Sequence, residues 1–190
     1  MSDSENITLW KKKAEIEYIP LFIPLWLSLD AWMRDRYTER ADRKRLEMFK
    51  RGEHKIADEF YELLFDEDNA RAKAFQGNLA ELHKALIDAA IPYNKEQGMY
   101  ISFSCIRVDK NNNGNLEYIS LIKNKRQKNR IELIEGVYFT NEKDKLFAGF
   151  IEILYQIRCA LFHGDLKPNS ENERVIKLLY LVTTEITKKV

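Results

Sequence analysis

The spacing of apolar positions along the chain predicts a mainly helical protein. In most of the sequence apolar residues recur every three or four positions, which places them on one face of a helix. The densely charged segment 34–55 predicts a solvent-exposed helix with salt bridges. We expect helices over residues 8–18, 56–65 and 141–163. Another helix begins between Pro20 and Pro24 and ends near Tyr37, and another runs from the acidic segment 66–69 to Pro92. The last helix is capped by Ser170.

The period changes around residues 99–139. Met99–Val108 and Leu116–Ile122 are rich in β-branched and aromatic residues, and an asparagine-rich turn lies between them. Ile131–Phe139 predicts a further strand. We therefore predict one domain over residues 1–190, mainly α, with a small β-hairpin insertion.

Composition adds two constraints. The formal net charge is +1, so any attraction to nucleic acid must come from a local patch. Cys105 and Cys159 are too few for a disulfide framework, which favours a reducing cytoplasm. The most apolar stretch, Ile19–Met33, is shorter than the roughly 20 residues that span a bilayer, so we expect a core helix and no membrane partner.

Two opposite charges interrupt these apolar faces. Arg158 lies on the same helical stripe as Leu154 and Leu161, and Asp30 follows Trp26 by one turn. Burying an unpaired charge is costly, so each needs a partner. Either Arg158 pairs with Asp30 as a buried structural bridge, or Arg158 faces an anion that is not part of the fold.

The segment 158–163, Arg-Cys-Ala-Leu-Phe-His, lies near the end of the penultimate helix. An arginine and a histidine separated by four residues at this place resemble the motif of the HEPN superfamily (higher eukaryotes and prokaryotes nucleotide-binding). Tyr155 before the motif, and Gly164 and Lys167-Pro168 after it, strengthen the resemblance. The early stretch Phe22–Trp32 is also similar to the first core helix of prokaryotic HEPN proteins. The resemblance covers most of the chain.

The resemblance implies a HEPN-like bundle of about five to six helices and a metal-independent endoribonuclease. In that reaction the RNA 2′-hydroxyl attacks the neighbouring phosphate and leaves a 2′,3′-cyclic phosphate. Arg158 and His163 would be catalytic, with Asp30 and Tyr155 in support. The implied partners are RNA, a second copy of the chain that completes a composite active site, and a cognate antitoxin protein. A toxin or phage-defence effector fits this set, and no cofactor or metal is expected.

The residue types suit that chemistry. Histidine titrates near neutral pH and can donate or accept a proton, and the arginine fork binds two phosphate oxygens while keeping its charge. One histidine cannot easily be both acid and base in one step, which is why a dimer enters the mechanism. The alternative for His163 is a helix C-terminal cap favoured by the dipole. Tyr155 fits a core position equally well.

Basic residues outside the motif are candidates for RNA contact. Lys125, Arg126, Lys128 and Arg130 lie in the loop before residue 131, and Lys167 follows the motif. A basic loop could follow an RNA backbone, although a solvated hairpin loop has the same composition.

Cys159 stands where many active HEPN members carry asparagine, aspartate or histidine after the arginine. This departure favours an alternative function, a non-catalytic module that binds RNA, a nucleotide or a partner protein. The three histidines, His54, His83 and His163, lack zinc-type spacing, so no metal site is predicted.

Overall fold

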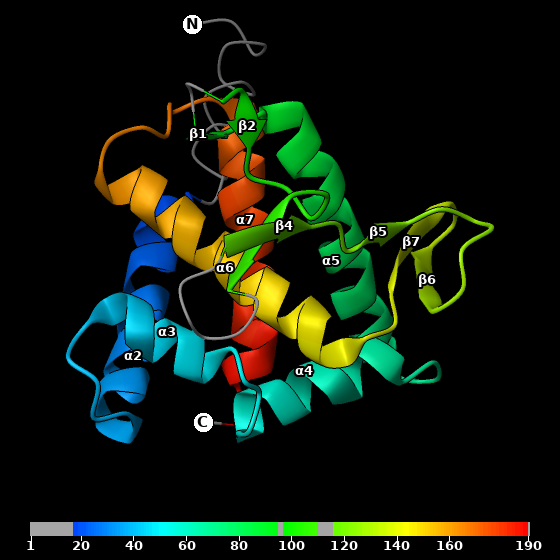
Figure 1. The fold of residues 1–190 in the computed structure, drawn as a ribbon, viewed down its shortest axis with the longest axis horizontal. Helices are drawn as coiled ribbons and strands as arrows, with labels where there is room; N and C mark the ends of the chain where they lie inside the picture. The colour runs from blue at the N-terminus through cyan, green and yellow to red at the C-terminus, as the bar shows by residue number, and fades with distance from the viewer. Residues whose placement is uncertain (1–16, 95–96, 110–115, 190) are drawn as a thin grey trace, which may run out of the picture.

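A computed structural model describes residues 17–94, 97–109 and 116–189. Its helices pack as a bundle, to which small antiparallel strand pieces are added (Figure 1). The mainly helical fold with a small β insertion is therefore confirmed. No helix within these ranges is long and apolar enough to cross a membrane. The helices described are α2 (Ile19–Arg36), α3 (Asp42–Phe49), α4 (Lys55–Phe65), α5 (Ala70–Ala89), α6 (Lys143–Phe162) and α7 (Ser170–Thr187).

The strands form three separate antiparallel pieces. These are β1 (Pro92–Asn94) with β2 (Met99–Tyr100), β3 (Ile106–Asp109) with β4 (Leu116–Ile119), and a three-stranded sheet in the order β5 (Ile122–Lys123), β7 (Val137–Thr140), β6 (Arg130–Ile134). The predicted hairpin exists as β3–β4. The strand expected over Met99–Val108 is divided, because Met99 and Tyr100 pair with β1 instead. The strand expected over Ile131–Phe139 is a hairpin, and Gly136 at φ +79° makes its turn.

Some helix boundaries differ from the prediction for local reasons. Helix α2 begins at Ile19, so that Pro20 sits in the first turn and Pro24 lies inside the helix. The cap of α7 is Asn169, not Ser170, because the Asn169 side chain accepts a hydrogen bond from the Asn172 N–H at 2.9 Å. The helix predicted over residues 8–18 and the asparagine-rich turn at 110–115 fall outside the described residues, apart from Glu17 and Tyr18.

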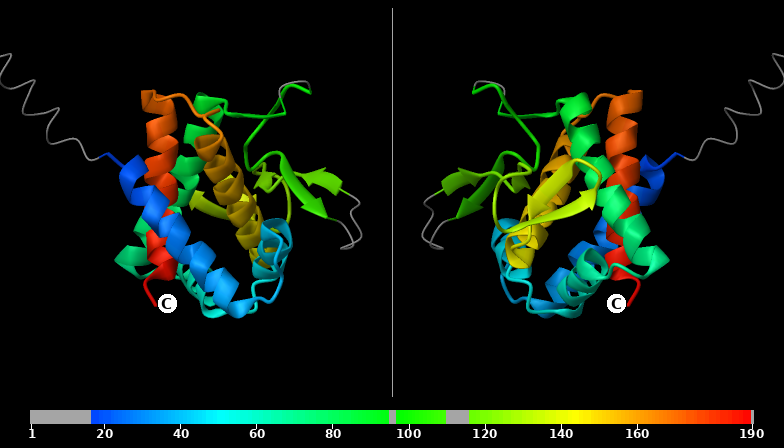
Figure 2. Two further views of the ribbon diagram at one scale, coloured as in Figure 1. Left: turned by 90° about the vertical axis from the view of Figure 1, so that its left-hand side faces the viewer. Right: turned by 90° about the vertical axis from the view of Figure 1, so that its right-hand side faces the viewer.

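Helix α6 runs through the middle of the bundle. Figure 2 shows α2 and α7 on the opposite side of it from the β3–β4 ribbon. The core contains a cluster of fully buried phenylalanines, among them Phe60, Phe75, Phe147 and Phe150. Gly149 lets the β insertion pack directly on α6, since a Cβ there would overlap the Leu121 side chain and touch Ile106. The β3–β4 ribbon and α6 therefore lie in direct contact and line neighbouring parts of the surface.

The charged segment 34–55 is not simply a solvated helix, which corrects the prediction. Arg45 and Lys50 are both buried. The Arg45 guanidinium donates to the backbone carbonyls of Glu39 and Arg40 at 2.9 and 2.8 Å. The apolar stems of these two basic side chains are thus buried in the fold while their charges find partners.

His54 fixes the start of α4 in a way that depends on its protonation. Its ring stacks on Phe49 with centroids 4.4 Å apart, its Nδ1 accepts from the Ala57 N–H, and its Nε2 lies 2.8 Å from the Phe49 carbonyl. These two contacts need the neutral tautomer with hydrogen on Nε2. Burial lowers the pKa of His54, and burial also lowers the pKa of the buried His83.

We expect the free energy of unfolding to fall as pH drops below about 6.5. The folded-state pKa lies below the unfolded value, so the unfolded chain takes up the proton first as pH falls. The stabilisation by the neutral histidine is therefore complete above the unfolded pKa and is lost as pH falls through the folded-state pKa. The slope is at most about 1.4 kcal/mol per pH unit for each histidine. Urea denaturation of the wild type and His54→Asn between pH 7.5 and 5.5 measures it. The variant keeps a capping side chain, so an equal slope in both proteins would contradict this role of His54.

Candidate functional site

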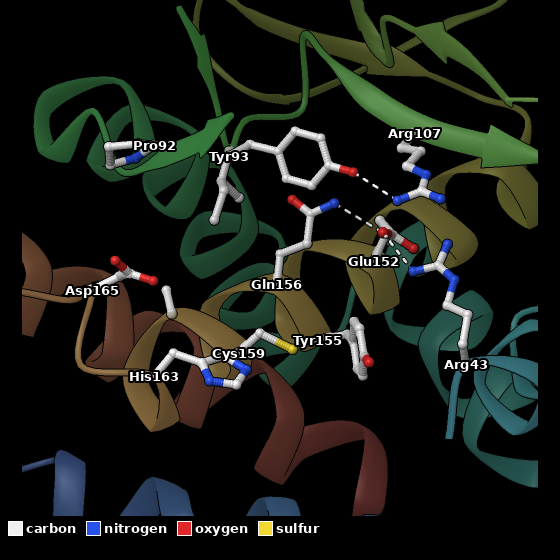
Figure 3. Close-up of a pocket in the computed structure, with 12 residues that line it drawn as sticks. Arg43, Pro92, Tyr93, Arg107, Glu152, Tyr155, Gln156, Cys159, His163 and Asp165 are labelled. Atoms are coloured by element: carbon white, nitrogen blue, oxygen red, sulfur yellow. Dashed lines mark hydrogen bonds and ion pairs between the residues drawn. The ribbon is translucent and has the colours of Figure 1, made fainter. Parts of the chain in front are cut away.

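One face of α6 carries the polar side chains of a cleft. Glu152, Gln156, Cys159 and His163 follow at intervals of four, three and four residues, which stacks them along one side of the helix. The cleft has a volume of about 210 Å³. Its other walls come from α3 and the β insertion, which brings together segments distant in the sequence (Figure 3). The remaining lining residues are Arg43, Pro92, Tyr93, Ile101, Arg107, Tyr155, Ala160 and Asp165.

Glu152 is the most buried charge of this cleft, with only 1% of the residue exposed. Arg43 Nη1 donates to its Oε1 at 2.9 Å, Lys50 pairs with its Oε2, and Gln156 Nε2 donates to Oε1 at 2.8 Å. Burial alone raises the pKa of this carboxyl, but the charge of Lys50 and the hydrogen bond from Arg43 outweigh burial and hold the pKa below its usual value. Glu152 is therefore ionised at neutral pH.

Arg107 lies at the same end of the cleft as Glu152. Its Nη1 donates to the Tyr93 hydroxyl at 2.8 Å, so β1 and β3 are tied across the cleft wall (Figure 3). Its Nε is buried, and none of the described residues offers it a hydrogen-bond acceptor. This end of the cleft consequently carries two guanidinium groups, those of Arg43 and Arg107.

His163 lies at the other end, just past the last residue of α6. It is exposed, and Gly164 follows it at φ +75°, a conformation that glycine adopts at little cost. The chain then turns back, because the Asp165 and Leu166 N–H groups both donate to the Ala160 carbonyl. The predicted glycine stop is confirmed, and it leaves the His163 imidazole at the rim of the cleft.

Arg158 points to a different side of α6 and does not line the cleft. Its guanidinium lies 4.7 Å from the Phe162 ring centroid and 5.6 Å from that of Trp26. Nη1 is 3.9 Å from Cys159 Sγ, and Nε is buried with no hydrogen-bond acceptor among the residues that the structure describes. Within the described residues no carboxylate pairs with it. Two aromatic rings thus hold a guanidinium for which the described part of the chain supplies no anion.

The proposed bridge between Asp30 and Arg158 is wrong. Asp30 pairs with Arg34 at 2.9 Å and with Arg45 at 3.8 Å. Arg34 on α2 and Arg45 on α3 therefore neutralise the Asp30 carboxylate, and Arg158 on α6 is not among its partners. Asp30 therefore does not support Arg158 directly, and the second charge that interrupts an apolar face is a structural link between α2 and α3.

Tyr155 connects the two sides of α6. Its ring contacts the Trp26 ring at 6.1 Å between centroids, Arg43 lies over it at 5.8 Å, and the residue lines the cleft. Burial, and after it the neighbouring Cys159 thiol, raise the pKa of Tyr155. Tyr155 is thus both a packing residue and part of the site surface, and its supporting role stays a prediction.

The basic residues predicted to bind RNA occupy two separate places. Lys125, Arg126 and Lys128 are exposed in the loop between β5 and β6, and Arg130, also exposed, is the first residue of β6. This loop ends close to the start of α6, because the Asn129 carbonyl accepts from the Asn141 N–H at 3.1 Å. Since α6 has 20 residues, its start and the His163 end are about 30 Å apart. Lys167 is exposed four residues after His163. Only Lys167 is therefore near the motif.

Several residues of the cleft were not identified from the sequence. Glu152 had a signal in the sequence, because it is an acidic residue in the most apolar part of the helix. Arg158 was noticed for the same reason, as a basic residue in an apolar stripe. Arg43 and Lys50 had no such signal, since they are two of many basic residues in the charged segment 34–55. Tyr93 and Arg107 owe their position to the folding of the β insertion onto α6.

No known family, curated protein or solved structure matches the chain. The resemblance to HEPN proteins accordingly stays a prediction. Among the residues described, no group of three or more His, Cys, Asp or Glu side chains is arranged to hold a metal ion.

The different surroundings of Arg158 and Glu152 predict different effects on stability. Arg158→Ala removes contacts with two rings, so we expect the free energy of unfolding to fall by at most about 2 kcal/mol. Glu152→Ala leaves the cations of Lys50 and Arg43 without their shared carboxylate and should cost about 3–5 kcal/mol. Urea denaturation at pH 7.5 compares them. Equal losses would mean that Arg158 is mainly a structural residue.

Proposed function

We propose that this protein is a metal-independent endoribonuclease, with Arg158 on the scissile phosphate and His163 as a proton-transfer group. The observation that carries the proposal is the state of Arg158. A partly buried guanidinium that has no carboxylate among the described residues, and is held by Trp26 and Phe162, is prepared for an anion from outside. The exposed His163 follows Arg158 by five residues, just past the end of the same helix. The resemblance of this pair to the HEPN motif supports RNA as that anion.

The chemistry needs no more than these groups. A base removes the proton of the RNA 2′-hydroxyl, the oxygen attacks the adjacent phosphorus, and an acid protonates the leaving 5′-oxygen. The products are a 2′,3′-cyclic phosphate and a 5′-hydroxyl. Arg158 stabilises the negative charge that grows on the phosphate oxygens, and its rigid support between two rings means that little reorganisation is required.

A second copy of the chain is part of this proposal. Arg158 and His163 of one chain point to different sides of α6, and one histidine supplies only one of the two proton transfers. A homodimer supplies the second histidine in a composite site. Leu21 and Leu27 on α2 and Phe162 on α6 are exposed apolar side chains, and such side chains suit burial in an interface.

The alternative is a binding module that holds RNA, a nucleotide or a protein partner without cutting. The observation that favours it is the separation of the two motif residues, since His163 lines the cleft and Arg158 does not. Cys159, in contact with Arg158, replaces the polar residue expected after the arginine. Binding without product formation would select this alternative.

The proposed activity has consequences for the cell. An endoribonuclease that needs no metal acts on accessible RNA as soon as it is folded, so a cytoplasmic location and a cognate antitoxin protein belong to the proposal. A role as a toxin or phage-defence effector follows from the same reasoning.

We expect the purified protein to cleave total RNA in the presence of EDTA and to leave cyclic phosphate ends. His163→Ala and Arg158→Ala should each slow cleavage by about 100-fold or more, as losses of proton transfer and of phosphate stabilisation do. Gel analysis and end-group analysis measure both effects. Arg36→Ala is the matched control, because Arg36 lies over Trp32 at 5.2 Å, much as Arg158 lies over Trp26.

The control should cleave at the wild-type rate. Cleavage by His163→Ala at that rate, or cleavage that EDTA abolishes, would contradict the proposal.

We also expect a dimer whose disruption removes activity. Leu27 is 53% exposed, so Leu27→Asp should leave the melting temperature nearly unchanged while it places a charge in the proposed interface. Light scattering should then show a monomer, and cleavage should fall together with the dimer. Ile87→Asp on α5 is the control, since Ile87 is 58% exposed and lies on another helix. A wild-type monomer that cleaves RNA would disprove the composite site.

A further inference from the structure

Gln156 presents a hydrogen-bond acceptor of fixed direction to the cleft. Its Nε2 donates to Glu152 Oε1 at 2.8 Å. An ionised carboxylate accepts hydrogen bonds and donates none, so the amide can meet it only with its NH₂ group. The carbonyl oxygen of Gln156 therefore points away from Glu152, toward the part of the cleft between Tyr93, Pro92 and Cys159 (Figure 3).

The support behind Gln156 is itself rigid. Glu152 is held by Lys50 and Arg43, two cations from α3 and the segment that follows it. A flip of the Gln156 amide would bring its oxygen against this carboxylate, which is a repulsive contact in a buried place. Glu152 thus acts as a positioning residue, and the acceptor on Gln156 is fixed before any ligand arrives.

The rest of the cleft suits a flat, polar ring with a phosphate attached. Tyr93 provides an aromatic ring, Pro92 and Ile101 provide apolar surface, and Arg107 provides a guanidinium oriented by the Tyr93 hydroxyl. Single-stranded RNA is bound by this combination, with bases against aromatic rings, hydrogen bonds to base edges and arginine at the backbone. The volume of about 210 Å³ is below the range of roughly 300–1,000 Å³ typical of larger ligands, so one nucleotide is the fitting unit.

The position along α6 relates the cleft to the motif. Gln156 precedes His163 by seven residues on the same face, which is about 10 Å along the helix axis. A strand whose scissile phosphate lies near His163 would therefore place a neighbouring nucleotide beside Gln156.

We propose that this cleft binds the base of a nucleotide next to the scissile bond, and that Gln156 Oε1 makes it prefer bases with an exocyclic amino group. This inference rests on the proposed ribonuclease function. Adenine and cytosine each offer an amino N–H to an acceptor. Uracil offers only a ring N–H flanked by two carbonyl oxygens, which repel the Gln156 oxygen. Gln156 is thus a specificity-determining residue for single-stranded RNA.

The test uses the His163→Ala protein, in which cleavage should be strongly slowed, and fluorescent five-nucleotide oligomers of adenylate, cytidylate and uridylate. Fluorescence anisotropy should show tighter binding of the adenylate and cytidylate oligomers than of the uridylate oligomer. Gln156→Met, added to this protein, keeps the length of the side chain and removes the acceptor. It should weaken binding of the adenylate and cytidylate oligomers by about three- to tenfold and remove the ranking of the three affinities.

Two further variants separate positioning from general damage. Glu152→Gln frees the Gln156 amide to flip, so the ranking should diminish while binding of the uridylate oligomer is kept. Gln127→Met removes a glutamine outside the cleft, whose Oε1 accepts from the Asn124 N–H, and should leave the ranking unchanged. Melting temperatures of all the variants confirm that each is folded.

The outcomes separate this inference from the ribonuclease proposal. If the ranking is absent, or survives Gln156→Met, the inference is overturned, whatever the cleavage assay gives. If Gln156→Met removes the ranking and the wild type cuts no RNA, the cleft is a nucleobase site and the ribonuclease proposal fails alone.

Discussion

The buried carboxylate of Glu152 is the interaction on which the cleft depends. It lies in the middle of α6 and draws Arg43 and Lys50 inward from a segment more than a hundred positions earlier in the chain. An ion buried to this degree is tolerable only when its charge is matched and its oxygens are filled, and here Gln156 completes the set. The same contacts that neutralise Glu152 close the inner end of the cleft and fix the groups that face a ligand.

Helix α6 separates two chemical environments. On one side Arg158 lies between Trp26 and Phe162 without a counter-charge among the described residues, and on the other side a polar cleft leads to His163. Within one chain these sides do not share a pocket. A second copy of the chain would supply the missing histidine, and the cleft would hold the adjoining part of a bound strand. Catalysis and recognition would then be divided between two faces of one helix.

Much of the fold follows from local patterns, and the errors have physical causes. The helices were found because apolar spacing reports one buried face, and the end of α6 was found because Gly164 suits a positive φ. Met99–Val108 was not one strand, because Met99 and Tyr100 pair with β1, a partner that no local pattern indicates. The charged segment 34–55 resembled a solvated helix because a run of charges does not say which of its members turns inward.

The sequence alone determined the helical class, the position of Arg158 and His163 at the end of the penultimate helix, and the presence of charges in apolar faces. Only the tertiary structure decided which charges meet. Asp30 pairs with Arg34 and Arg45, while Arg43 and Lys50 take the buried Glu152. The reason is that periodicity is a property of neighbouring residues, whereas the partner of a buried charge depends on how distant elements cross. The cleft, and the fixed acceptor of Gln156 within it, arise at such a crossing.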